Sequence, residues 1–124
     1  MKLRIRGNSV RLRVSQTELD AMAQRGFTED RIRFGPGSEL VYRLAVAPGG
    51  GVSAELAGTR VCVSIPRAEF ERWLAPSEVS IRAEQPIGQD ERLAILVEKD
   101  FECLQPREGE DASDLFPNPA KSRS

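Results

Sequence analysis

The chain has 124 residues, of which 40% are hydrophobic and 30% are charged, and its formal net charge is -1. These values predict a single soluble domain with one small core. No hydrophobic run is long enough to cross a bilayer, and the first segment alternates charge with Leu and Ile, unlike a signal peptide. We therefore expect a cytoplasmic protein that does not contact a membrane.

The sequence contains no histidine, which is the commonest general base and a common transition-metal ligand. No arrangement of acids, serines or cysteines resembles a catalytic site, so we expect neither an enzyme nor a bound metal or cofactor. Cys62 and Cys103 are too few for a disulfide framework and favour a reducing compartment. A disulfide between them, or a redox role for either, stays open.

The first half predicts two strands, a helix and two more strands. Alternating residues on both sides of Gly7-Asn8 indicate a β-hairpin from Leu3 to Val14. Ser15 and Glu18 form a capping box that starts a helix, whose residues Leu19, Met22 and Ala23 face the core. Gly26 ends the helix. Strands around 31–34 and 40–46 follow, separated by the turn 35–37.

The second half repeats this plan after the glycines at 49–51. A hairpin is expected over 52–56 and 60–65, with Gly58 in its turn. Pro66 is expected as the first helical residue, and Phe70, Trp73 and Leu74 are expected in the core. The last strands are predicted at 79–83 and 93–97, with a turn at 86–88.

The two halves also match as sequences, because Leu3–Ala23 can be aligned with Ala54–Leu74 without a gap. A repeated unit that cannot bury its own hydrophobic face must pack against its copy. We therefore expect one globular domain over residues 1–104, made of repeat one (1–48) and repeat two (52–104). Residues 105–124 are rich in Pro, Gly, Ser and acids, and we expect them to form a flexible acidic tail.

Charge is distributed unevenly along the chain. The first hairpin alternates arginines with hydrophobic residues, so its arginines share one face. Arginine suits bidentate binding of phosphate, which indicates nucleic-acid binding, although a solvated sheet face protected by charge is the alternative. The Gly7-Asn8-Ser9 turn would position these side chains and offer backbone N–H groups. The predicted nucleic-acid-binding residues are Arg4, Arg6, Asn8, Ser9, Arg11 and Arg13.

The tail contains one hydrophobic pair flanked by acids, at Asp114, Leu115 and Phe116. These residues are the predicted partner-binding segment, since such segments can fold on binding a protein. Two alternatives stay open: an inert solvated chain, and an acidic segment that covers the basic hairpin and competes with nucleic acid.

Several motifs resemble known families. Arg6–Val14 and the strand Val61–Pro66 are similar to the swapped-hairpin unit of AbrB, MazE and MraZ-like proteins. The resemblance implies that the two units exchange hairpins in one interlocked barrel and that the first hairpin binds DNA. The whole chain also resembles short uncharacterised bacterial proteins, a domain of unknown function, through its Arg-Gly-Asn-Ser opening, Glu84–Gly88, Glu98–Phe101 and Phe116–Pro119.

Together these observations predict an α+β protein, with two ββαββ repeats forming one pseudo-twofold swapped-hairpin-like β-barrel and two short helices. The expected function is that of a non-enzymatic regulatory protein that binds nucleic acid, with DNA as the expected partner. The alternative is a protein-interaction module that acts through its tail. A monomer or a homodimer is expected.

Overall fold

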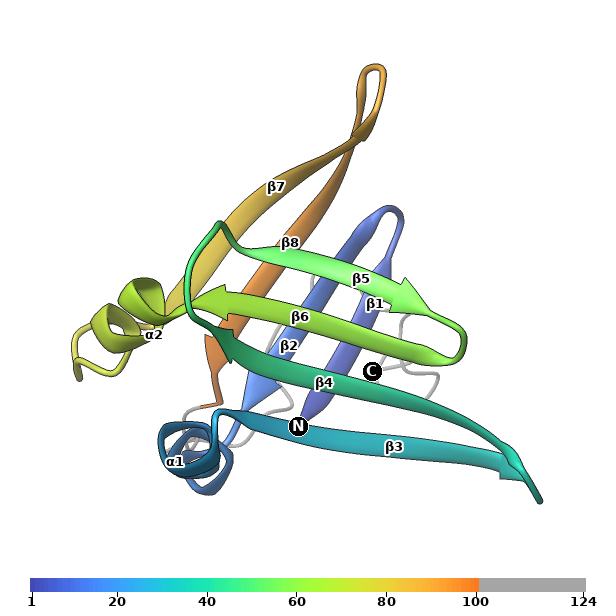
Figure 1. Cartoon of the computed structure of the whole chain (residues 1–124), viewed down its shortest axis with the longest axis horizontal. Coiled ribbons are helices and arrows are strands. Elements are labelled where there is room, and N and C mark those ends of the chain that lie inside the picture. Colours follow the sequence, from blue (N-terminus) through green and yellow to red (C-terminus); the bar gives the residue numbers. More distant parts are fainter. Residues whose placement is uncertain (101–124) are drawn as a thin grey trace, which may run out of the picture.

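The computed structural model describes residues 1–100, which form a mostly β structure with two short helices (Figure 1). The order ββαββ occurs twice, as the sequence predicts. The elements are β1 (Lys2–Arg6), β2 (Ser9–Val14), α1 (Gln16–Arg25), β3 (Phe27–Gly35), β4 (Ser38–Ala47), β5 (Ser53–Ala57), β6 (Arg60–Pro66), α2 (Arg67–Trp73), β7 (Ser80–Gly88) and β8 (Glu91–Lys99).

The strands form two four-stranded sheets, and each sheet combines a hairpin from each half of the chain. Sheet A has the order β1-β2-β8-β7, and sheet B has the order β3-β4-β6-β5. The hairpins join through the parallel pairs β2–β8 and β4–β6. Figure 1 shows the two sheets crossing each other, with both helices on the left of the view. The halves therefore exchange hairpins rather than fold side by side.

The registers of the two parallel pairs are equivalent. Arg11 lies opposite Leu96 in β2–β8, and Cys62 lies opposite Arg43 in β4–β6. Arg11 corresponds to Cys62 in the sequence repeat, and Leu96 corresponds to Arg43 when the β7–β8 and β3–β4 registers are superposed. Each position on sheet A thus has a counterpart on sheet B, although the residue types often differ.

The core lies between the sheets and under the helices. Alternation in β2 and β6 buries Leu12 and Val63, and the helices add Met22 and Trp73. The indole N–H of Trp73 donates to the carbonyl oxygen of Val79 at 3.0 Å, so the buried ring keeps a hydrogen bond. The buried hydrophobic cluster comprises Val10, Leu12, Val14, Leu19, Met22, Leu44, Val63, Ile65, Phe70, Trp73, Ile81, Ile95 and Val97.

The predicted closed barrel is not found, because the strands of residues 1–100 pair only within the two sheets. β7 and β5 are not paired through their backbones, and the side chain of Gln85 on β7 connects them instead. The amide N–H of Ala54 donates to Gln85 Oε1 at 2.7 Å, and Gln85 Nε2 donates to the carbonyl oxygen of Ala54 at 3.0 Å. On the other side, the Tyr42 hydroxyl donates to the Met1 carbonyl oxygen at 3.3 Å.

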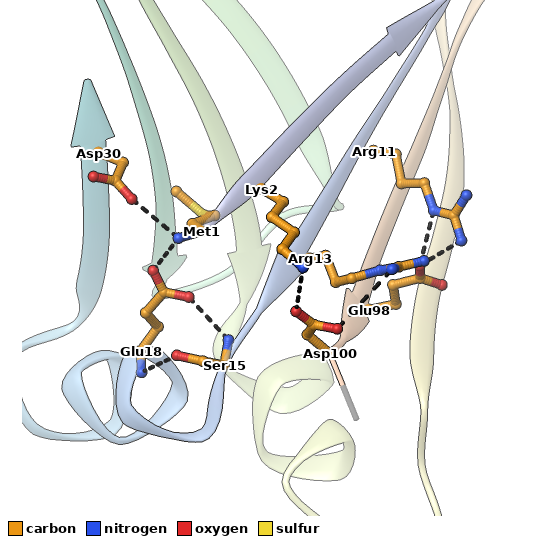
Figure 2. Close-up of polar contacts among 9 residues, drawn as sticks. All are labelled: Met1, Lys2, Arg11, Arg13, Ser15, Glu18, Asp30, Glu98 and Asp100. Carbon is orange, nitrogen blue, oxygen red and sulfur yellow. Dashed lines mark hydrogen bonds and ion pairs between the residues drawn. The ribbon is translucent and has the colours of Figure 1, made fainter. Parts of the chain in front are cut away.

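The start and end of α1 agree with the sequence prediction. The backbone N–H of Glu18 donates to Ser15 Oγ at 3.2 Å, and the Ser15 N–H donates to Glu18 Oε1 at 2.9 Å. Gly26 ends the helix with φ 92°, a left-handed conformation that favours glycine. Glu18 also pairs with the Met1 amine, which lies 3.0 Å from Asp30 Oδ2 (Figure 2).

Three details of the second half differ from the prediction. Leu74 is 39% exposed, because α2 has only seven residues and presents Phe70 and Trp73 to the core. Pro66 precedes α2 as its N-cap residue rather than beginning it. β7 continues through Gly88, so the predicted turn at 86–88 is strand, and the chain reverses at Gln89-Asp90, where Asp90 has φ 60°.

Candidate nucleic-acid interface

The β1–β2 hairpin places the four predicted arginines on the outer face of sheet A. Arg4 lies opposite Arg11, and Arg6 lies opposite Ser9. The tight turn depends on Gly7, whose φ is 56°, and on Ser9 Oγ, which donates to the carbonyl oxygen of Arg6 at 2.6 Å. Because side chains alternate along a strand, these residues point away from the buried face that contains Leu12.

Strands β8 and β7 extend this face with residues from the second half of the chain. Register partners define a row that crosses the whole sheet: Arg4, Arg11, Leu96 and Arg82. Parallel to it, on the hairpin-turn side, lies the row Arg6, Ser9, Ala94 and Glu84. On the opposite side lies the row Lys2, Arg13, Glu98 and Ser80.

A hollow of about 660 Å³ occupies this face. Its charged lining consists of Arg4, Arg6, Arg11, Arg82 and Glu84, and its remaining side chains on this face are Ser9, Ala94 and Leu96. The small side chains of Ser9 and Ala94 stand next to long arginines, which leaves space between them. The hollow therefore combines four guanidinium groups with a floor of small and apolar side chains.

Glu98 holds two of the predicted arginines (Figure 2). Arg11 Nε donates to Glu98 Oε1 at 2.8 Å, and Arg13 Nε donates to the same oxygen at 3.0 Å. Burial acts to raise the pKa of Glu98, but the hydrogen bonds and charges of Arg11 and Arg13 outweigh it, so this pKa lies below its ordinary value. Glu98 thus neutralises part of the basic face from within.

Asp100, which directly follows β8, adds a second acid. Its Oδ2 lies 3.0 Å from Lys2 Nζ, and its Oδ1 lies 4.0 Å from Arg13 Nη1 (Figure 2). The side chain of Arg13 is 26% exposed, compared with 33% for Arg11. Arg13 is therefore less available than Arg11, and the basic face is strongest toward the hollow.

Arg4 and Arg82 differ from this pair. Both are exposed, and within residues 1–100 neither side chain makes an ion pair or a hydrogen bond. Arg82 was not among the residues that the sequence indicated. The sequence around Arg82 shows only that charged residues alternate along β7, and this pattern does not predict which strand pairs with β7.

The side chains of the turn residues are used within the fold. Asn8 Nδ2 donates to the carbonyl oxygen of Arg92 at 2.6 Å, and the carbonyl oxygen of Asn8 accepts from the Ala94 N–H at 3.1 Å. These bonds fasten the β1–β2 turn to β8. Asn8 and Ser9 therefore position the hairpin. No contact of the described residues tests the expectation that they also bind nucleic acid.

Other predicted features lie away from this face or outside the described residues. Asp114, Leu115, Phe116 and Cys103 belong to residues 101–124, so the predicted partner-binding segment lies outside the part that the structure describes. Cys62 is a half-buried free thiol on the outer face of sheet B. Among residues 1–100, no group of three or more Cys, Asp or Glu side chains could hold a metal ion.

Neither helix in the described region has the length and hydrophobicity of a membrane-spanning segment. No match to the chain was found among curated proteins or among solved structures. One family matches along nearly the whole sequence: residues 1–120 fit the model described as "Family of unknown function (DUF7009)". The expected resemblance to an uncharacterised domain is thereby confirmed, and the chain belongs to this family of unknown function.

Proposed function

We propose that this protein is a non-enzymatic, cytoplasmic regulatory protein that binds nucleic acid through the outer face of sheet A. The observation that carries the proposal is the hollow lined by Arg4, Arg6, Arg11 and Arg82, with Glu84 as its one acid. Guanidinium groups bind phosphate oxygens in a bidentate manner and remain charged at every physiological pH. Four of them around one hollow favour a ligand that carries several phosphates.

Sheet B provides a comparison within the same molecule. Its outer face also carries arginines, but Arg43 Nε lies 2.8 Å from Glu29 Oε1, and Arg31 Nη1 lies 3.2 Å from Glu39 Oε2. Within residues 1–100, Arg4 and Arg82 on sheet A and Arg33 on sheet B make no ion pair. Sheet A is favoured because its arginines gather around one hollow.

The strand order gives indirect support. The AbrB, MazE and MraZ-like resemblance implies exchanged hairpins and DNA binding through the first hairpin, and the hairpins of this chain are exchanged between its two sheets. β1 and β2 carry most of the arginines around the hollow. The proposed ligand is therefore a nucleic acid, contacted mainly through its phosphates.

Fluorescence anisotropy with labelled oligonucleotides at low salt tests the proposal. The double variant Arg4→Ala/Arg82→Ala removes two exposed cations and should weaken binding by about tenfold or more. Arg31→Ala/Arg33→Ala on sheet B is the matched control, with the same charge change, and should retain most of the affinity. Absence of binding by the unmodified chain, or equal losses in both variants, would contradict the proposal.

A further inference from the structure

We propose that the hollow of sheet A selects single-stranded nucleic acid by accepting an unpaired base between its arginines. This inference rests on the proposed function, because it assigns a ligand class to the same phosphate-binding face. Three observations carry it: the shape of the hollow, the chemistry of its floor and the placement of the two arginines without ion pairs.

The shape of the hollow is the first observation. Its volume is about 660 Å³, and its lining places the small side chains of Ser9 and Ala94 beside long arginines. A duplex presents phosphates on a convex surface and keeps its bases stacked inside. It can touch the arginines at the rim, but no part of it fills the hollow. A base that is not paired can enter.

The floor is the second observation. Leu96 is half-buried at the centre of the sheet, and Ala94 precedes it on the same face, so the floor offers apolar contact. Phosphate binding uses charged and hydrogen-bonding groups, so it does not explain an apolar floor. The flat face of a base packs well on apolar side chains and on guanidinium planes, and such stacking is a main source of affinity in single-strand binding.

The arginines are the third observation. Arg4 on β1 and Arg82 on β7 end the row in which Arg11 and Leu96 are the middle members. Three strand spacings separate their backbones, about 14 Å in total. Arg4 and Arg82 lie on opposite sides of Arg11 and the apolar Leu96, and they can bind the phosphates that flank one unpaired nucleotide. A single strand would then run across the strands of sheet A.

The test compares a labelled single-stranded oligothymidylate of about 12 nucleotides with a duplex of the same length. The unmodified chain should bind the single strand about tenfold more tightly. Ala94→Leu fills the hollow without changing charge, so it should weaken single-strand binding more than duplex binding and thereby remove this preference. Ala57→Leu, an exposed position on β5 of sheet B, is the matched control and should preserve the preference.

A second variant separates loss of the binding hollow from misfolding of the protein. Leu96→Gln keeps the size of the side chain but removes its apolar contact, and it should also reduce the single-strand preference; circular dichroism checks that each variant is folded. Equal binding of duplex and single strand by the unmodified chain, or equal losses of both with Ala94→Leu, would overturn this inference while the proposed function survives. If neither nucleic acid binds, both fail.

Discussion

Arg13 and Glu98 are register partners across the parallel pair β2–β8, and Arg13 Nε donates to Glu98 Oε1 at 3.0 Å. The first residue belongs to the first half of the chain, and the second belongs to the last strand. The same carboxylate oxygen accepts from Arg11. An acid contributed by one half of the chain therefore restrains two cations of the other half, at the border of the proposed binding face.

This relationship predicts opposite effects of Glu98→Gln on affinity and stability. Removing the negative charge frees Arg11 for phosphate and leaves Arg13 with Asp100 as its remaining acid, so affinity for nucleic acid at low salt should rise about fivefold. The loss of charge-assisted hydrogen bonds should lower the free energy of unfolding by about 1–2 kcal/mol. Anisotropy titrations and urea denaturation measure the two effects.

Glu29→Gln is the control for this prediction. Glu29 lies on sheet B, where it pairs with Arg43 and Arg31. Its replacement frees Arg43, leaves Arg31 paired with Glu39, and changes the net charge by the same amount. A comparable gain in affinity in this variant would mean that total charge, rather than sheet A, governs binding.

The Glu98 contacts also predict a pH dependence. Because Arg11 and Arg13 hold the pKa of Glu98 below its ordinary value of 4.5, its stabilising effect is complete above that pH and is lost as the pH falls through the pKa of the folded state. The difference in unfolding free energy between the unmodified chain and Glu98→Gln should be constant from pH 7 to about 5. It should shrink in acid, and a difference that grows there would refute the assignment.

Gln85 predicts a local effect at the junction between the sheets. Gln85→Ala removes both side-chain bonds to the Ala54 backbone and should lower the free energy of unfolding by about 1–2 kcal/mol. Hydrogen exchange measures the local consequence, since the Ala54 amide should exchange faster in the variant. Unchanged protection of this amide would show that the two sheets are held together without Gln85.

Trp73 and Leu74 are neighbours with different expected roles. Trp73 is fully buried and touches Phe70 edge-on with ring centroids 6.4 Å apart, so Trp73→Ala should cost about 3–5 kcal/mol. Leu74 is 39% exposed at the end of α2, so Leu74→Ala should cost less than about 1 kcal/mol. Thermal or urea denaturation of both variants checks the corrected position of Leu74, and a large loss with Leu74→Ala would restore the original prediction.

The sequence was sufficient for features that neighbouring residues decide. Gly7-Asn8 predicts the first turn, Ser15 and Glu18 predict the start of α1, and Gly26 predicts its end. Strand alternation was enough to place Arg4 and Arg11 on one face, because side chains two residues apart point the same way. These signals act over a few residues, so no tertiary information was needed.

The prediction was less accurate where local signals conflict. Pro86-Ile87-Gly88 has turn chemistry, yet β7 runs through it, because pairing with β8 continues to Gly88. Leu74 continues the apolar spacing of α2, yet the helix is too short to bury it. In both cases long-range packing overrides the preference of a short segment.

The sequence by itself determined the repeated ββαββ order, the caps of α1 and the arginine face of the first hairpin, since each depends on contacts within a few residues. Only the tertiary structure decided that β8 lies beside β2, and with it that Glu98 meets Arg13 and that Arg82 joins Arg4 around one hollow. The physical reason is that pairing between distant strands is set by burial of the shared core, to which both halves contribute, and no local propensity encodes that choice.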